Sequence, residues 1–354
     1  MNKKKIAVLF GGCSSEYGIS LKSSYSVLTN IDREKYDIIP IGITQQGDCY
    51  HFYGDVEKVL ADEWFNEEDC VKAYIVPDRS VHGMVELTAD GPVFTRLDAA
   101  FPMLHGKNGE DGTVQGLIEL AGIPLMGCGV MSSALCMDKY RAHVVAEEAG
   151  IAVPKATSLN GSMNEEEVQA LTKDLIYPLF VKPVKAGSSY GITVVENPKD
   201  LMAAVEYALE YDDEVIAEEK ITGFEVGCSI IGDGKSDEII GRVDEIELFT
   251  GCFFDFTRKY TGVDSKIHTP ARIDAETEER IKEAGRTLFR ALGCSGYARL
   301  DMFLTPEGRI VFNEVNTIPG FTSVSRFPKI MAGVGLSYKE VIDKIIEVGL
   351  HTHC

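Results

Sequence analysis

The sequence lacks any long, uninterrupted run of apolar residues. No stretch approaches the roughly 18 residues that a membrane-spanning helix needs, and the apolar run at residues 6–10 is too short for the core of a secretion signal. We therefore expect a cytoplasmic protein with no membrane partner, in which residues 6–10 form a buried first strand.

Positive charge and paired cysteines are also scarce. The chain has 35 Lys and Arg residues against 55 Asp and Glu, a formal net charge of −20. Because a phosphate backbone would be repelled, nucleic acid is not an expected partner, and an anionic nucleotide would need a local cluster of cations and backbone amides. The nine cysteines include no CxxC pair, which indicates reduced cytoplasmic thiols rather than a disulfide framework.

Several catalytic motifs are missing. There is no GxSxG, no HExxH and no GxGxxG, and the nearest match to a Walker loop, at residues 232–236, lacks the first glycine. The sequence therefore does not support a serine hydrolase, a zinc peptidase or a dinucleotide-binding fold. The chemistry that remains plausible is phosphoryl transfer.

The length of 354 residues predicts two or three domains. Alternating strands and helices over residues 1–127 predict an α/β domain with a mostly parallel sheet, including a helix over 114–121 that Thr113 can cap. Residues 128–222 begin with a predicted helix over 134–149 and continue with short strands around a Gly/Ser loop. Residues 223–354 contain predicted strands at 226–231 and 238–248, a helix over 275–292, a strand pair and a closing helix, so the fold is α/β with an α+β C-terminal part.

Four polar residues mark the predicted strand pair near the C-terminus. Side chains on a strand alternate between faces, so Arg299 and Asp301 share one face, as do Glu314 and Asn316. Three hard oxygen donors suit Mg²⁺, and a neighbouring Arg suits a phosphoryl group. The alternative is a solvated strand face with surface ion pairs, but the flanking residues are apolar, and unpaired charge is costly among them.

The register of this strand pair decides whether the four groups meet. If the turn at residues 305–308 pairs Leu304 with Arg309, Asp301 lies opposite Phe312 and Arg299 opposite Glu314. All four polar side chains then point the same way, whereas a slip of one residue would separate them.

Lysines and small residues predict a phosphate-binding loop in the middle of the chain. Lys182 ends an apolar strand, and the following loop contains Lys185, Gly187, Ser188 and Ser189. Small residues let backbone N–H groups approach an anion, and lysine adds positive charge. A plain turn is the alternative.

Further residues are candidates for nucleotide contacts. Glu218 and Glu225 flank Gly223 and could accept hydrogens from an adenine amine and a ribose, unless they form an acidic surface turn. Lys139 lies early on its predicted helix, where a cation opposes the helix dipole, and this suggests a nearby ligand. An ordinary surface lysine is the alternative.

Two polar loops follow strands of the first domain, where α/β sheets collect ligands. The loop at residues 11–16 ends in Glu16, which could hold an ammonium group, and the loop at 105–112 begins with His105, which could orient that carboxylate. Either residue could instead be structural or solvated.

Taken together, the motifs resemble those of the D-alanine:D-alanine ligase family of the ATP-grasp superfamily. The resemblance extends from the first strand to the last helix and is carried by residues 10–16, 105–116, 137–139, 182–189, 259–260, 299–301 and 313–320. It implies three domains, with boundaries here near 127 and 222, ATP held between the second and third, amino acids bound against the first, and a homodimer.

The resemblance also implies roles for individual residues. It implies that ATP is contacted by Lys139, Lys182, Ser188, Ser189, Glu218, Glu225 and Lys259. It also implies that two Mg²⁺ ions, for which Mn²⁺ is a substitute, are bound by Asp301, Glu314 and Asn316. Glu16 would hold the ammonium group of the first D-alanine and form a hydrogen-bonded trio with Ser188 and Tyr260. Arg299 and the backbone N–H of Gly320 would stabilise negative charge as an acyl phosphate forms and an amine displaces the phosphate.

Two departures from the family pattern concern the second substrate. Ser325 is followed by Arg326 where these enzymes usually have leucine, and Phe254 stands where they tend to have tyrosine. A lost hydroxyl and an added cation with five donors fit a substrate with an extra hydroxyl, so the pattern resembles the D-alanine:D-serine ligases of vancomycin resistance. Retention of Tyr260 argues against D-lactate. A D-alanine:D-alanine ligase with an unusual pocket, in which Arg326 makes only a surface ion pair, and a nucleotide sensor without activity are the alternatives.

Overall fold

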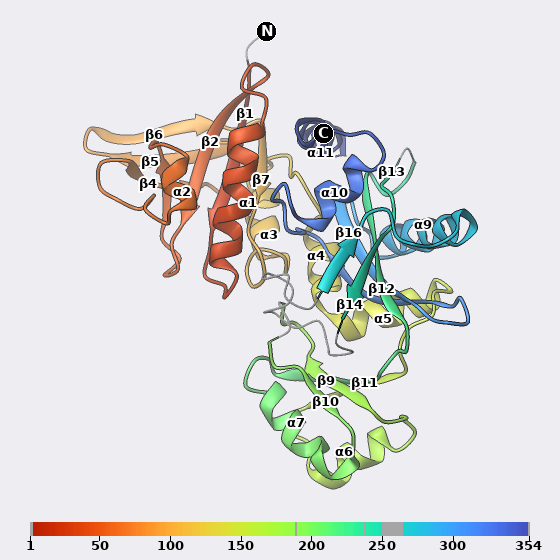
Figure 1. Ribbon diagram of the computed structural model, residues 1–354. Coiled ribbons are helices and arrows are strands. Elements are labelled where there is room, and N and C mark those ends of the chain that lie inside the picture. The colour runs from red at the N-terminus through yellow and green to blue at the C-terminus, as the bar shows by residue number, and fades with distance from the viewer. Residues whose placement is uncertain (1–2, 188–189, 237, 250–264, 353–354) are drawn as a thin grey trace.

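Three β-sheets organise the protein in a computed structural model that describes residues 3–187, 190–236, 238–249 and 265–352 (Figure 1). The sheets occupy successive parts of the chain, as the α/β prediction requires, and the domain boundaries near residues 127 and 222 stay predictions. Among the described residues, no helix combines the length and the apolar character needed to cross a bilayer.

The first sheet has seven strands in the order β6-β5-β4-β3-β2-β1-β7. Their bounds are β1 (Lys4–Gly11), β2 (Tyr36–Ile43), β3 (Cys49–Phe52), β4 (Cys70–Ile75), β5 (Gly83–Thr88), β6 (Gly91–Arg96) and β7 (Ala99–Pro102). The pairs β1–β2 and β1–β7 are parallel, as predicted, whereas β3 to β6 extend the sheet with antiparallel pairs. The prediction of a mostly parallel sheet therefore holds only for the three strands β2, β1 and β7 at one edge.

Helices α1 (Tyr17–Asn30), α2 (Glu57–Leu60) and α3 (Thr113–Leu120) belong to the same region. Thr113 was predicted to cap helix α3, but it is the first residue of the helix. The N-cap residue is Gly112, whose φ of 91° favours glycine. Apolar side chains of α1, such as Leu21 and Leu28, pack against the first sheet with Phe10 and Trp64.

The predicted helix over 134–149 is two helices, α4 (Val130–Met137) and α5 (Lys139–Glu148). Asp138 separates them in an extended conformation, and its side chain accepts a hydrogen bond from the N–H of Arg141 at 2.9 Å. This N-cap competes with continuous helix. Lys139 consequently becomes the first residue of a new helix.

The second sheet is fully antiparallel, with strand order β10-β9-β11-β8. It consists of β8 (Ala156–Asn160), β9 (Leu179–Pro183), β10 (Thr193–Val195) and β11 (Glu214–Glu219), with the short helix η1 (Pro198–Asp200) and helices α6 (Glu165–Thr172) and α7 (Leu201–Ala208). Apolar residues of the sheet and of α6 and α7 form their own core. This unit lies in the lower part of Figure 1.

The third sheet has the order β15-β14-β12-β16-β17, and β13 pairs with β12. Its elements are β12 (Phe224–Gly232), β13 (Ile239–Ile240), β14 (Asp244–Leu248), β15 (Ser265–His268), α9 (Ala275–Ala291), β16 (Gly296–Leu304), β17 (Ile310–Asn316), α10 (Arg326–Ala332) and α11 (Tyr338–Thr352). The predicted single strand over 238–248 is divided at Gly241, where a Cβ would lie 2.4 Å from a side-chain carbon of Ile330 in α10. The close approach of α10 explains the interruption.

Candidate active site

A cavity of about 1240 Å³ is lined by residues of the second and third sheets and by helix and loop residues of the first part of the chain, such as Glu16, Ile19 and His105. Every predicted site residue that the structure describes lines it: Glu16, His105, Lys139, Lys182, Glu218, Glu225, Arg299, Asp301, Glu314, Asn316, Gly320, Ser325 and Arg326. The remaining predicted residues, Ser188, Ser189, Phe254, Lys259 and Tyr260, lie outside the described residues.

The strand pair β16–β17 brings the four polar groups together, but not in the predicted register. Leu304 pairs with Ile310 rather than with Arg309, and an irregularity between Asp301 and Met302 leaves Asn313 as an extra residue in β17. Asp301 therefore lies opposite Glu314, and Arg299 opposite Asn316. The slip and the bulge each shift the pairing by one residue, so together they restore the common face.

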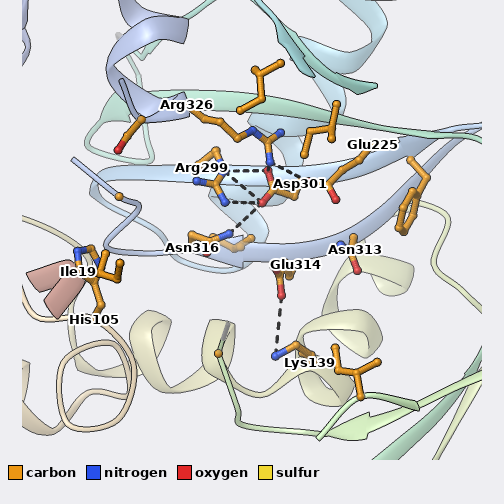
Figure 2. Close-up of a pocket in the computed structure, with 18 of the residues that line it drawn as sticks. Ile19, His105, Lys139, Glu225, Arg299, Asp301, Asn313, Glu314, Asn316 and Arg326 are labelled. Carbon is orange, nitrogen blue, oxygen red and sulfur yellow. Dashed lines mark hydrogen bonds and ion pairs between the residues drawn. The ribbon is translucent and has the colours of Figure 1, made fainter. Parts of the chain in front are cut away.

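Arg299 and Asn316 both bind the carboxylate of Asp301. The Arg299 Nε lies 2.9 Å from Oδ1, its Nη2 lies 2.7 Å from Oδ2, and the Asn316 amide donates to Oδ2 at 3.0 Å. Asp301 is almost fully buried, at 1% exposure. A buried carboxylate needs such partners to stay ionised, and Figure 2 shows these contacts at the centre of the site.

Arg326 is buried in an ionic cluster with three carboxylates. Its Nε and Nη2 bind both oxygens of Asp244 at 2.8 Å, and its Nη1 lies 2.7 Å from Glu225 and 3.2 Å from Asp301. Asp244 itself is fully buried. A Cβ on Gly227 would lie 2.4 Å from both Arg326 Nη2 and Asp244 Oδ1, so only glycine leaves room for this pair.

This geometry bears on two site residues, whose predicted ligand contacts stay predictions. Arg326 does not form a surface ion pair, and most of its donors, expected to face the second substrate, are directed to carboxylates of the protein. Glu225, expected to contact ATP, binds Arg326 (Figure 2). Asp244 had no signal in the sequence, because its pairing with Arg326 joins residues 82 positions apart.

Lys182 and Glu218 form a buried ion pair on adjacent strands β9 and β11. Their Nζ and Oε1 atoms are 2.6 Å apart. The second oxygen of Glu218, Oε2, is buried and has no hydrogen-bond partner among the described residues. A buried carboxylate oxygen without a partner is costly, and it can accept a hydrogen bond from a ligand in the cavity.

Lys139 joins the loop of the second sheet to the third sheet. Its Nζ donates to the carbonyl of Ala186 at 2.8 Å and lies 3.9 Å from Glu314 Oε2. Glu16 lies against the same loop, because a Cβ on Gly187 would be 2.7 Å from Glu16 Oε2. The three parts of the chain therefore converge on the carboxylates of Glu16 and Glu314.

Both ring nitrogens of His105 have partners other than the Glu16 carboxylate, which His105 was predicted to orient. Its Nδ1 lies 2.8 Å from the carbonyl of Ile318, and its Nε2 lies 3.0 Å from the Ser23 hydroxyl. Burial lowers the pKa of His105, although the nearby Glu16 charge opposes this shift. A neutral ring fits the two contacts, since a carbonyl can only accept.

Glu110 is a site residue that sequence reasoning missed. Its Oε1 accepts from the N–H of Ile318 at 3.0 Å, and its Oε2 accepts from the N–H of Gly106 at 2.9 Å. Burial and then the charge of Glu16 raise its pKa to about 8. Its position within the polar loop that starts at His105 was the available signal.

The third sheet also continues into a turn that lines the cavity. Ser325, the N-cap residue of α10, accepts a hydrogen bond from the N–H of Thr322 at 3.1 Å. A Cβ on Gly320 would lie 3.2 Å from the Ser325 hydroxyl oxygen. Gly320 and Ser325 therefore face each other across this turn.

The donors near Asp301 fit a Mg²⁺ ion that also binds a phosphate. In the described part of the chain, no group of three or more His, Cys, Asp and Glu side chains could hold a metal by itself. Asp301, Glu314 and Asn316 instead offer two carboxylates and an amide on one strand pair. Mg²⁺ typically takes a few such oxygens and completes its shell with water and substrate phosphates.

Comparison with known proteins identifies the family. A family profile described as "D-ala D-ala ligase N-terminus" matches residues 5–128, and one described as "D-ala D-ala ligase C-terminus" matches residues 145–347. The vancomycin/teicoplanin A-type resistance protein VanA of Enterococcus faecium is 42% identical over 353 residues, which cover 99% of each chain.

Solved structures are similar over nearly the whole chain. The VanG D-Ala:D-Ser ligase from Enterococcus faecalis has a TM-score of 0.91 and 54% identity, covering 98% of this chain and 100% of that chain. The D-alanine–D-alanine ligase from Bacillus anthracis complexed with ATP has a TM-score of 0.72 and 30% identity, covering 99% and 98%. The chain therefore belongs to the D-alanine–D-alanine ligase family and is an ATP-dependent ligase with the ATP-grasp fold.

Proposed function

We propose that this ligase joins D-alanine to D-serine and releases ADP and phosphate. The observation that carries the proposal is the 54% identity, over nearly all of both chains, to a D-Ala:D-Ser ligase, against 30% identity to the D-alanine–D-alanine ligase from Bacillus anthracis. The buried cluster around Arg326 supports it, because it places a cation where the family usually has leucine. Such a dipeptide would serve a modified peptidoglycan precursor, made in the cytoplasm by a homodimer.

The proposed reaction has two steps. A carboxylate oxygen of D-alanine attacks the γ-phosphorus of ATP, which forms an acyl phosphate and releases ADP. The neutral amine of D-serine then attacks the acyl carbon, the amide bond forms, and inorganic phosphate leaves while the amine loses a proton. Exclusion of water protects the acyl phosphate between the steps.

The cavity offers a residue for each charge in this scheme. Lys139 and Lys182 would meet the phosphates, and Glu218 Oε2, which is buried without a hydrogen-bond partner in the described structure, would accept from an amine of the nucleotide. Glu16 would hold the ammonium group of D-alanine. Arg299 would stabilise the negative charge that develops at the acyl centre.

Asp301, Glu314 and Asn316 would hold Mg²⁺, with Mn²⁺ as a substitute. When bound, the ions neutralise phosphate charge and thereby favour attack at the γ-phosphorus. Arg299 and Arg326 keep the Asp301 carboxylate in place for this role, because both bind its oxygens.

A competing candidate is a D-alanine–D-alanine ligase of ordinary cell-wall synthesis. It is favoured by the relatives of that activity and by the orientation of Arg326, whose donors are mostly taken by carboxylates. A pocket that admits D-serine also admits the smaller D-alanine unless its polar groups are left unpaired.

Phosphate release with D-alanine alone, with D-serine alone and with both, followed by mass analysis of the product, tests the proposal. We expect D-alanyl-D-serine as the main product of the mixture. Mainly D-alanyl-D-alanine in the mixture would favour the competing candidate, and no dipeptide under any condition would contradict both. A Glu314→Gln variant measures the background release.

A further inference from the structure

Helix α1 buries three serines beside its apolar residues. Ser20, Ser23 and Ser24 are all fully buried. A buried hydroxyl is costly unless it is hydrogen-bonded. The Ser20 hydroxyl meets this requirement, because it donates to the carbonyl of Met103 at 2.5 Å and accepts from the N–H of Gly11 at 2.8 Å.

Ser23 belongs to a chain of hydrogen bonds whose directions are fixed by chemistry. The Ile318 carbonyl can only accept, so His105 carries a proton on Nδ1; burial lowers the pKa of His105 and favours the neutral ring, whose Nε2 then accepts. The Ser23 hydroxyl consequently donates to Nε2 at 3.0 Å, and its oxygen accepts from the N–H of Phe321 at 3.2 Å. The chain begins and ends on the same segment, residues 318–321.

This segment is the turn that follows strand β17 and contains Gly320. It is held at three points by the first part of the chain: His105 binds the carbonyl of Ile318, Glu110 binds its N–H, and Ser23 binds the N–H of Phe321. The peptide planes 318–319 and 320–321 are thereby held, and the plane between them, which carries the Gly320 N–H, is held from both sides. Donors that are oriented before the reaction stabilise a developing charge at no reorganisation cost.

We infer that Ser23 is a positioning residue for the turn at 318–321, and that it sets the orientation of the Gly320 N–H toward the acyl centre. Ser23 acts through His105 and Phe321 and need not touch the substrate. The inference rests on the proposed ligase function. It predicts that loss of the Ser23 hydroxyl affects catalysis more than nucleotide binding.

Ser24 provides a matched control for this inference. It is the next residue of the same helix, it is equally buried, and its hydroxyl has no hydrogen-bond partner among the described residues. Ser23→Ala and Ser24→Ala therefore remove the same atom from neighbouring buried positions. Only the first breaks the connection to the turn.

The kinetic experiment compares steady-state parameters of the two variants with those of the unmodified enzyme. We expect Ser23→Ala to lower kcat by about tenfold to a hundredfold, part of the loss seen when an oxyanion donor is removed, with the KM for ATP within twofold. Ser24→Ala should leave both within about threefold. Equal losses in kcat for the two variants, or a loss confined to the KM for ATP, would overturn the inference.

A second measurement does not depend on activity. Amide hydrogen exchange of Gly320 and Phe321 should accelerate at least about tenfold in Ser23→Ala and not in Ser24→Ala, because a lost tertiary hydrogen bond frees the turn. Unchanged exchange in Ser23→Ala would refute the positioning role, even if the unmodified enzyme formed no dipeptide. Absence of dipeptide with accelerated exchange would instead contradict only the proposed function.

Discussion

Replacing Arg326 with leucine removes the cation that holds Asp244 in the interior. In the described structure, the fully buried Asp244 carboxylate accepts two side-chain hydrogen bonds, both from Arg326 and both at 2.8 Å. Removal of one partner from a buried ion pair costs about 3–5 kcal/mol, because the other charge stays behind without compensation. We therefore expect Arg326→Leu to lower the free energy of unfolding by about this amount.

The size of the effect can be separated from simple loss of packing. Adding Asp244→Asn removes the stranded charge, so the double variant should regain about 2 kcal/mol over Arg326→Leu alone, a part of that penalty. Arg242→Leu is the matched control. Arg242 also binds a carboxylate through two nitrogens, on Glu278, but its side chain is 38% exposed, so its loss should cost only about 1 kcal/mol.

Urea denaturation followed by circular dichroism measures these differences. The midpoint of Arg326→Leu should fall well below that of Arg242→Leu, with a similar dependence on urea concentration. The reasoning fails if Arg326→Leu and Arg242→Leu are equally stable. It also fails if Asp244→Asn makes the Arg326→Leu protein less stable still.

Three further predictions concern the cavity. Lys182→Met should raise the KM for ATP at least about tenfold, since a charge-assisted contact is lost. The control Lys185→Met, at an exposed position, should change this KM by less than about twofold. Equal effects of the two variants would contradict a nucleotide-binding role of Lys182. The pKa of Glu110 is raised to about 8, so the folded protein binds this proton more tightly than the unfolded chain does. The free energy of unfolding should therefore fall as the pH rises from 5 to 8, by at most about 1.4 kcal/mol per pH unit. Denaturation across this range should show a flatter profile for Glu110→Gln, and identical profiles would refute the shift. Arg326→Leu combined with Phe254→Tyr should move the product at least about fivefold toward D-alanyl-D-alanine by mass analysis; an unchanged product ratio would remove both residues from the specificity hypothesis.

Local sequence patterns singled out the described site residues one by one, and the resemblance to a family joined them into one site; they line one cavity. Alternation along a strand placed Arg299 with Asp301, whereas Lys139 was expected early on a helix over 134–149 and is in fact the first residue of α5. The face shared by the strand pair was predicted even though its register was not. A bulge at Asn313 cannot be read from alternation, because it depends on how β17 packs.

Long-range contacts were not predictable in the same way. The partners of Arg326 come from β12, β14 and β16, and no periodic pattern links Asp244 to a residue so far along the chain. Ser23 resembled an ordinary polar residue of a helix, because its importance depends on where the segment from 318 to 321 returns. The antiparallel strands β3 to β6 were missed for a related reason: their edge strand β6 is largely exposed and shows little apolar alternation.

The asymmetry of the Arg326 cluster has a consequence for how the protein could change over generations. If Asp244 is replaced first, Arg326 still has Glu225 and Asp301 as partners. If Arg326 is replaced first, the Asp244 carboxylate stays buried without the cation that binds it. Mutational paths that alter residue 326 should therefore pass through position 244, and Gly227 becomes free to accept a side chain only after both steps.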